Sequence, residues 1–175
     1  ITITKPTAFY TVPNALCNND TIQAINSSTG VGDLSYEWFL NANSFSIDTN
    51  ASVNISVPNP VGLSTPFILS LIVADSNGCT DTLLQTINVS TPHAIPSYTF
   101  SGAVLNVNGE YDCPPLFCNF TDASQSYGNI TGWNWTFGNG NTSILENPSN
   151  TLVNNGTFDL TLSITDQYGC TDDTT

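Results

Sequence analysis

The side chains that could do chemistry are few in this chain, and almost all of them are acidic. Against 14 Asp and Glu residues stand one cation, Lys5, and one imidazole, His93. Catalysis needs a nucleophile beside a base, a polarised pair of carboxylates or a metal cluster. His93 lies in the stretch TPHAIP, where we expect it to be solvated, and a single Lys cannot clamp a phosphate or carboxylate substrate. The sequence therefore predicts that the chain is not an enzyme.

The charge balance excludes two classes of partner. The formal net charge is −13 at pH 7, and such a charge repels phosphate backbones and anionic lipid headgroups. We therefore expect no nucleic acid and no membrane surface among the partners. The longest apolar run, FILSLIVA, has the length of a buried strand and falls far short of the roughly 20 residues that span a bilayer. No membrane insertion is expected in this segment.

The acidic residues raise the question of a calcium site, because Ca²⁺ binds carboxylate and carbonyl oxygens. The acids near the two Gly-Cys turns and before a further cysteine are Asp75, Asp81, Asp166, Asp172, Asp173, Glu110 and Asp112. Their spacing is not that of an EF-hand loop. We expect these residues to serve as solvated turns and strand ends rather than as a calcium site, so we predict no cofactor.

Internal repetition organises the chain. The stretch SLIVADSNGCTDT is echoed about 90 residues later by TLSITDQYGCTDD. A second echo pairs SYEWFLNAN with GWNWTFGNG, which aligns Trp38 with Trp135 and Tyr36 with Trp133. All these aromatic residues are expected in the core, which leaves no aromatic stripe to bind carbohydrate. Landmarks that recur in the same order indicate two copies of one module, joined at the Pro-rich stretch STPHAIPS.

Each copy consists of short alternating stretches separated by turn residues, and none keeps a helical periodicity. Thr, Val, Ile and aromatic residues favour strands, whereas Asn, Gly and Pro favour turns. Several short strands with turn signals between them are typical of a β-sandwich. The sequence therefore predicts an all-β chain of two tandem immunoglobulin-like sandwiches, at residues 7–91 and 92–175, with residues 1–6 as a strand for a neighbouring module plus a linker.

The second copy resembles the PKD domain, an immunoglobulin-like module. The family pattern runs Trp-x-Phe-Gly-Asp-Gly, then Asn-Pro, then a glycine and an alternating strand that ends in Asp and Gly. The matching residues are Trp135, Phe137, Gly138, Gly140, Asn147, Pro148, Gly156, Phe158, Leu160, Leu162, Ile164, Asp166 and Gly169. Asn139 replaces the acid of the Gly-Asp-Gly turn, which removes a charge from one plausible calcium site.

The first copy is a degenerate relative of the same pattern, with Leu40, Asn41 and Asn43 where Phe-Gly and Gly would stand. The Gly-Cys-Thr-Asp ending is similar to PKD arrays in long surface proteins of Bacteroidota-type bacteria. Modules of this family usually act as spacers or adhesive units. The resemblance therefore implies a structural role outside the cell.

The cysteines follow the repeat. Cys17 aligns with Cys113 at the first core strand of each copy, and Cys79 aligns with Cys170 just before the last strand. We predict the disulfides Cys17–Cys79 and Cys113–Cys170. Cysteines paired at similar spacing in a strand-rich chain argue for an oxidising compartment, and hence for an extracellular or cell-surface location.

A fifth cysteine, Cys118, has no counterpart in the first copy. Alternation in LFCNF places Cys118 and Phe120 on the buried face of a strand and Asn119 outside. We expect Cys118 to be a small buried hydrophobe, with a reactive or interchain thiol as the alternative. The sequence has no CxxC or Cys/His cluster, so we predict no metal site.

The acceptor motif for N-linked glycans, Asn-x-Ser/Thr, recurs along the chain. Within VNISV, INVS, CNFT and WNWT the Asn alternates with apolar neighbours and therefore points to solvent. The motif occurs at Asn19, Asn26, Asn50, Asn54, Asn88, Asn119, Asn129, Asn134, Asn141 and Asn155. A composition rich in Asn and Thr also generates the motif without any glycan, and Asp-Thr acceptors at Thr21, Thr82 and Thr174 offer a second type of glycosylation. We predict covalent glycans of one type or the other.

The first residues of the chain resemble a displaced strand. After its Gly-Cys the first copy runs TDTLLQTINVSTP, whereas the second runs TDDTT, so we expect the second sandwich to lack its last strand. Joining the end of the chain to its start gives TDDTTITITKP, which restores a strand and a proline. We expect Ile1, Thr2, Ile3 and Thr4 to complete a neighbouring module, along a continuous polypeptide or by donation between subunits. The alternative is an ordinary first strand of the first sandwich.

These observations predict a non-enzymatic extracellular structural module. We interpret it as a repeat unit of a glycosylated surface filament or long adhesin, with copies of itself or adjacent repeats as partners and strand completion as the joint. The alternatives are a glycan- or protein-binding module and a spacer of a secreted hydrolase.

Overall fold

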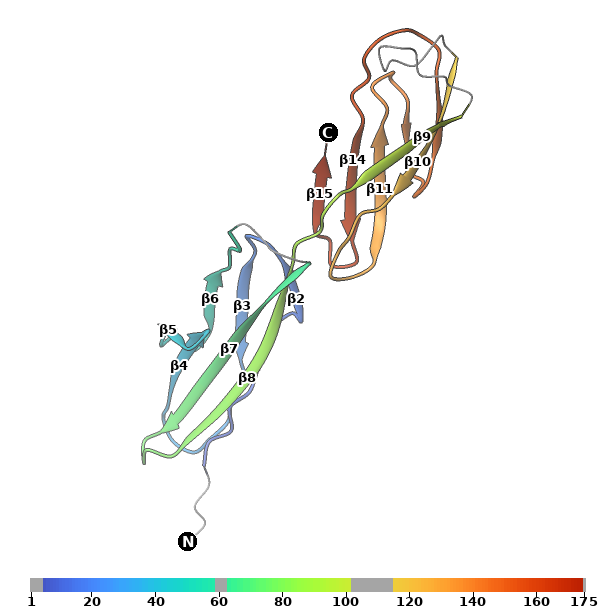
Figure 1. Ribbon diagram of the computed structural model, residues 1–175. Helices are drawn as coiled ribbons and strands as arrows, with labels where there is room; N and C mark the ends of the chain where they lie inside the picture. Colours follow the sequence, from blue (N-terminus) through green and yellow to red (C-terminus); the bar gives the residue numbers. More distant parts are fainter. Residues whose placement is uncertain (1–4, 59–62, 102–114, 175) are drawn as a thin grey trace. The chain divides into compact units, whose positions relative to one another are not determined.

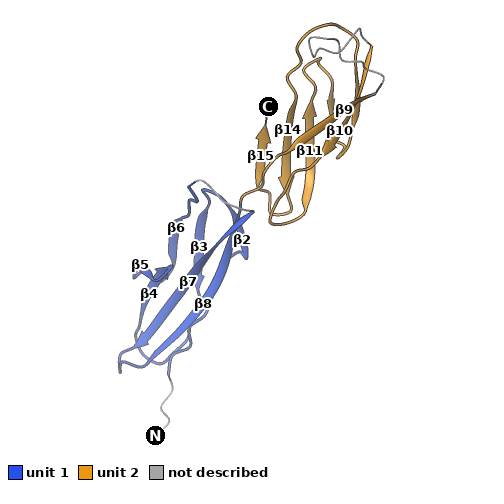
Figure 2. Cartoon of the chain, in the orientation of Figure 1, with its two compact units in different colours: residues 1–90 blue, residues 91–175 orange. Residues whose placement is uncertain are grey.

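Figure 1 shows a computed structural model of the chain, which describes residues 5–58, 63–101 and 115–174. The strand expected at Ile1 to Thr4 lies outside the described residues. The chain divides into two compact units, residues 1–90 and 91–175, shown in Figure 2. This division is one residue away from the boundary expected from the repeat. Every regular element in the described part of the chain is a β-strand.

The first unit contains two sheets. The smaller sheet has the strand order β1-β3-β6 and the larger one the order β2-β8-β7-β4-β5. The strands are β1 (Tyr10–Thr11), β2 (Ala15–Cys17), β3 (Thr21–Asn26), β4 (Leu34–Leu40), β5 (Asn43–Ser46), β6 (Ala51–Asn54), β7 (Ser64–Asp75) and β8 (Thr80–Ser90). Neighbouring strands are antiparallel except for β2 and β8, which run parallel, with Ala15 opposite Asn88 and Cys17 opposite Ser90.

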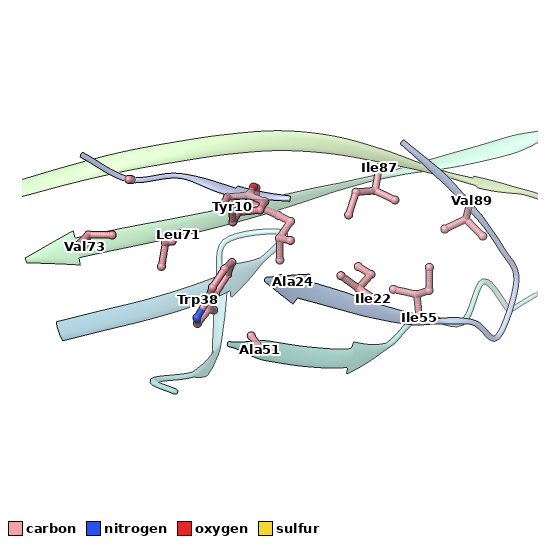
Figure 3. Packing of buried hydrophobic residues seen from close by; sticks show 12 residues of the cluster. Tyr10, Ile22, Ala24, Trp38, Ala51, Ile55, Leu71, Val73, Ile87 and Val89 are labelled. Carbon is pink, nitrogen blue, oxygen red and sulfur yellow. The ribbon is translucent and has the colours of Figure 1, made fainter. Parts of the chain in front are cut away.

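The core of the first unit lies between these two sheets. Figure 3 shows Ile87 of β8 pointing across the core toward Ile22 of β3. Trp38 is fully buried, and the ring of Tyr10 meets it edge-on at 5.1 Å. Alternate burial along β7 and β3 gives each strand one face in this core, as the period of two in a strand requires.

The second unit repeats this plan with fewer described strands. One sheet has the order β13-β10-β9 and the other the order β12-β11-β14-β15. The strands are β9 (Pro96–Ser101), β10 (Leu116–Asp122), β11 (Ile130–Thr136), β12 (Thr142–Ser143), β13 (Ser149–Leu152), β14 (Thr161–Asp166) and β15 (Thr171–Thr174).

Aromatic rings fill the core of the second unit. Phe120 of one sheet lies 5.8 Å from Trp135 of the other and 4.7 Å from Phe137, measured between ring centroids. Cys118 lies in the same core and is 1% exposed. Asn119, between Cys118 and Phe120 in the sequence, is exposed. The expected alternation of this strand is confirmed.

The last strand of the second unit is present, contrary to the expectation from the sequence. β15 pairs antiparallel with β14, from Thr171 opposite Thr165 to Thr174 opposite Leu162. The turn before β15 returns the chain directly alongside β14, so the residues after Cys170 extend a hairpin. β15 has 4 residues, whereas its counterpart β8 has 11. The second unit therefore has its last strand.

No helix in the described residues has the length and apolar character needed to cross a membrane.

The phenol of Tyr10 gives the first unit a pH-dependent stability. Its hydroxyl donates a hydrogen bond of 2.6 Å to the carbonyl of Leu69, and burial raises the pKa of Tyr10 from 10.0 to about 12. The folded state thus keeps the phenol neutral at a pH where the unfolded chain ionises. The stability that the neutral phenol contributes is present below pH 10 and is lost as the pH rises toward 12.

We therefore expect Tyr10→Phe to cost about 1 kcal/mol of unfolding free energy at neutral pH and to weaken the loss of stability at alkaline pH. Urea denaturation of both proteins across this range measures the effect. Tyr98→Phe, at an exposed ring of the second unit, is the control. If the native chain and the Tyr10 variant lose the same unfolding free energy at alkaline pH, the prediction is contradicted.

Candidate functional site at the entry end of each unit

The turn between the last two strands is built around one aspartate in each unit. In the first unit Asp75, at the end of β7, accepts hydrogen bonds on Oδ1 from the backbone N–H groups of Asn77 and Cys79, both at 2.9 Å. Gly78 follows the tip of the turn with a φ of 83°, a conformation that favours glycine. The side chain of Asp75 is only 8% exposed, so these donors compensate for the loss of its hydration.

The second unit repeats the turn in detail. Asp166, at the end of β14, accepts on Oδ1 from the N–H groups of Tyr168 and Cys170, again both at 2.9 Å. Gly169 has a φ of 84°. The hydroxyl of Ser126 also donates to Oδ2 of Asp166 at 2.8 Å. The Asp-x-x-Gly-Cys repeat seen in the sequence is therefore one hydrogen-bonded turn built twice.

A second aspartate fastens the segment through which the chain enters each unit. In the first unit Asp81 lies 2.6 Å from the ammonium group of Lys5 through Oδ1, and its Oδ2 accepts the N–H of Ala8 at 2.9 Å. The hydrogen bond from Lys5, followed by that from Ala8, lowers the pKa of the Asp81 carboxyl. The entering segment is thereby bound to the start of β8.

The corresponding aspartate of the second unit binds in the same way. Oδ2 of Asp172 accepts the N–H of Ala94 at 2.8 Å and lies 3.7 Å from Nδ1 of His93. His93 is thus exposed beside an acid rather than placed against a nucleophile. We call the region formed by the Asp-x-x-Gly-Cys turn and the fastened segment the entry end of a unit.

Sequence reasoning missed this contact, although a signal for it was present. The stretch KPTA at residues 5–8 and the stretch TPHA at residues 91–94 share a Pro-x-Ala pattern, and the middle residue of each forms an isolated bridge, Thr7 with Thr29 and His93 with Gln125. The repeat therefore includes the segment that the sequence suggested was only a linker.

The predicted disulfide Cys17–Cys79 is wrong. Cys17 lies opposite Ser90 at the end of β8, whereas Cys79 directly precedes the first residue of the same strand. A strand of 11 residues spans roughly 35 Å at about 3.3 Å per residue, and a disulfide needs Cα atoms within about 7 Å of each other. Cys17 is disulfide-bonded, whereas Cys79 is a free, partly buried thiol.

The other cysteines have distinct states. Cys113 lies outside the described residues, so the pair Cys113–Cys170 stays a prediction. Cys170 is buried and disulfide-bonded. Cys118 is a free thiol inside the second core, and burial raises its pKa. These facts agree with a small buried hydrophobe and not with a reactive thiol.

The tryptophans belong to the cores, as the sequence indicated. Trp38 and Trp135 are fully buried, and each donates its indole N–H to a backbone carbonyl, at 2.9 Å and 3.0 Å respectively. Trp133 is partly buried against the second core and donates to Oδ2 of Asp122 at 2.7 Å.

The acidic residues weighed as calcium ligands do not gather. The described part of the chain contains no group of three or more His, Cys, Asp or Glu placed to hold a metal ion. The carboxylates of Asp75 and Asp166 accept backbone hydrogen bonds within the turns. Those of Asp81 and Asp172, which we call the clamps, bind the N–H groups of Ala8 and Ala94 in the entering segments. Glu110 and Asp112 lie outside the described residues.

The predicted glycan acceptors lie mostly on the surface. Asn26 and Asn88 are partly buried, and the others are exposed: Asn19, Asn50, Asn54, Asn119, Asn129, Asn134, Asn141 and Asn155. The residues that line a cavity of about 760 Å³ in the second unit include Asn119 and Asn141. A glycan on either residue would stand at the wall of this cavity.

The second unit has the features of a known family. Its paired sheets, its buried Trp135 and its Asp-x-x-Gly-Cys turn lie within one stretch of sequence. Residues 114–175 match the family model of the PKD domain. This match supports the resemblance inferred for the second copy over residues 114–175, and the second unit shares its Asp turn and its contact between an aspartate and the entering segment with the first unit.

Three solved structures that are similar to the chain are distant from it in sequence. The CbhA fibronectin(III)-like modules of Clostridium thermocellum are 12% identical, with 94% of this chain and 91% of that chain covered and a TM-score of 0.45. The SGBP-B protein of the Bacteroides ovatus mixed-linkage glucan utilization locus, in complex with a mixed-linkage heptasaccharide, is 9% identical, with 97% and 66% covered and a TM-score of 0.37.

The amphioxus IgVJ-C2 molecule is 12% identical, with 91% of this chain and 96% of that chain covered and a TM-score of 0.34. Among curated proteins, none matches the chain. The chain is all-β, and each unit packs its buried residues between two sheets in the manner of an immunoglobulin-like sandwich.

The Asp81 clamp predicts a specific pH dependence. Because the folded state lowers the pKa of Asp81, its carboxylate stabilises the fold above the ordinary pKa of 3.8 and loses this effect as the pH falls through the lowered value. We expect Asp81→Asn to lower the thermal midpoint of the first unit at neutral pH, because Lys5 loses its charged partner, and the difference from the native chain should vanish in acid.

Calorimetry from pH 7 down to about pH 2 checks this prediction, since that range spans the usual carboxyl pKa. Asp33→Asn removes the same charge from an exposed residue and serves as the control. A deficit as large for Asp33→Asn as for Asp81→Asn, or one that persists in acid, would refute the role of the clamp.

Proposed function

We propose that this chain is a non-catalytic structural module of an extracellular protein, a repeat unit of a glycosylated surface filament or long adhesin whose modules follow one another end to end. One observation carries the proposal. The first unit is fastened at both of its ends to the same strand, β8, by contacts that resist tension along the chain.

The entering segment is held at the start of β8 by Asp81, which binds both Lys5 and Ala8. At the other end β2 pairs with the last residues of β8 in parallel, and the N–H of Asn88 donates to the carbonyl of Asn14 at 3.3 Å. Tension between the two ends of the unit pulls β2 and β8 in opposite directions along their length. Because their hydrogen bonds lie across the strands, these bonds share the load instead of breaking one after another.

The same clamp recurs in the second unit, where Asp172 binds the N–H of Ala94. A device that fastens the incoming chain to the last strand is useful in a module that transmits force from the polypeptide before it. It has no evident use in a unit that binds a ligand at its surface. This recurrence supports a tandem structural role over the alternatives of a binding module and a hydrolase spacer.

Single-molecule stretching of the chain by its two ends tests the mechanical role. Leu16→Pro removes a backbone donor from β2, so we expect it to lower the unfolding force of one unit while the other keeps its native value. Val53→Pro removes a backbone donor from the edge strand β6, away from the path of tension, and is the matched control. Equal forces for the native chain and the Leu16 variant would overturn the mechanical role.

Glycosylation is a separate part of the proposal, supported by the exposure of most acceptor asparagines. We expect peptides that cover these sites, taken from the protein's natural source, to exceed their polypeptide masses by the masses of attached saccharides. Mass spectrometry of these peptides would locate the saccharides on the Asn-x-Ser/Thr or Asp-Thr sites. Masses equal to those of the bare peptides would refute this part and leave the structural role standing.

A further inference from the structure

The cavity of the second unit has no part in the structural role proposed above. It has a volume of about 760 Å³ and is lined by residues of β10, of β13 and of the loops that precede β12 and follow β13. This volume lies within the range of pockets that hold small ligands. Among the described residues that line it, none is charged. The cavity is therefore a site for a neutral molecule.

The loop before β12 forms a wall of fixed amide groups. Oδ1 of Asn139 accepts the N–H of Asn141 at 3.1 Å, and Nδ2 of Asn139 donates to the carbonyl of Thr151 at 3.3 Å. Nδ2 of Asn141 donates to Oδ1 of Asn150 at 2.8 Å. Gly138, with a φ of 69°, lets this loop lie against the backbone before β14, because a Cβ there would come within 2.6 Å of it. The amide groups are therefore positioned before a ligand binds, which lowers the entropy that binding costs.

Asn150 has one hydrogen-bond donor that nothing satisfies. Its Oδ1 accepts from Asn141, whereas its Nδ2 atom is buried and has no hydrogen-bond partner among the described residues. A buried donor without a partner lowers stability, and most such groups in folded proteins are satisfied by protein, water or a ligand. Asn150 lines the cavity. An oxygen atom of a bound ligand can accept from this donor.

Apolar side chains stand beside the amides. Phe117 and Val153 line the same cavity and are 56% and 63% exposed. The wall thus combines amide groups, which both donate and accept hydrogen bonds, with apolar surface. A neutral saccharide has the matching composition, because its hydroxyl groups donate and accept while its C–H groups form an apolar face. A phosphate or carboxylate ligand would require a cation, and none is among the described lining residues.

A peptide fits this site less well. An extended peptide binds at a sheet edge through free backbone groups, and β13 is at the edge of its sheet. The carbonyl of Thr151 in β13 already accepts a hydrogen bond from Asn139. This side-chain contact obstructs the pairing of a further strand with β13.

We propose that the cavity binds a neutral oligosaccharide, with Nδ2 of Asn150 donating to one of its oxygen atoms and the ring of Phe117 packing against its apolar face. The site gives the second unit a binding role that goes beyond its structural role and does not depend on it.

The experiment uses the purified 175-residue chain, produced in a host that attaches no glycans. Cellotetraose, xylotetraose, mannotetraose and maltotetraose are the probes, and binding is measured by isothermal titration calorimetry. We expect at least one of them to bind and to shift the side-chain amide signals of Asn150 and Asn141 in the ¹H–¹⁵N NMR spectrum. These signals report on the cavity itself, so they distinguish it from another surface.

Asn150→Asp keeps the acceptor oxygen and the shape of the side chain but replaces the donor, so we expect it to weaken binding about tenfold. Asn134→Asp makes the same change at an exposed residue outside the cavity and should leave binding unchanged. Phe117→Ala, at an exposed ring, is a second variant that should also weaken binding. Thermal unfolding followed by circular dichroism verifies the fold of each variant.

Four results would overturn the proposal. They are the failure of all four saccharides to bind, native affinity in both cavity variants, an equal loss in Asn134→Asp, and binding of tetragalacturonate or tetra-alanine as tight as that of the best neutral saccharide. The stretching experiment measures the structural role separately, so the two proposals fail independently.

Discussion

A buried carboxylate at the end of one strand organises each unit of this protein. Asp75 and Asp166 are 8% and 2% exposed, and a charge placed there is tolerated only because backbone N–H groups point at it. Those donors belong to the residues of the following turn, so satisfying the charge and closing the hairpin are the same event. The turn in turn sets the register of the last strand, since Thr80 and Thr171 begin β8 and β15 directly after it.

The other features of the entry end depend on this turn. With the register set, Asp81 and Asp172 stand two residues beyond the cysteine, where their carboxylates reach the N–H groups of Ala8 and Ala94. One side-chain acceptor thereby joins the first residues of a unit to its last strand. The clamp holds the entering segment at the start of β8, and β2 pairs with the last residues of the same strand. These two sets of contacts are the mechanical basis of the structural role proposed here.

The low content of reactive side chains agrees with this design. The carboxylates of the two turns and the two clamps hold backbone N–H groups, and the one Lys is bound to an aspartate. The cysteines are the remaining side chains whose chemical state can change, between a free thiol and a disulfide. The same turn carries a disulfide-bonded cysteine in one unit and a free thiol in the other.

The sequence by itself determined the all-β class, the buried tryptophans, the inward position of Cys118 and the division into two units, because these follow from the local alternation of side chains and from repetition. It did not reveal that Cys17 and Cys79 lie at opposite ends of β8. Alignment shows which residues correspond, but the distance between two of them depends on which strands pair, and the parallel pairing of β2 with the end of β8 is a long-range choice. The contacts made by Asp81 and Asp172 likewise depend on the tertiary structure. Each joins backbone and carboxylate groups more than 70 residues apart in the sequence, and only the closed sandwich brings them within hydrogen-bonding distance.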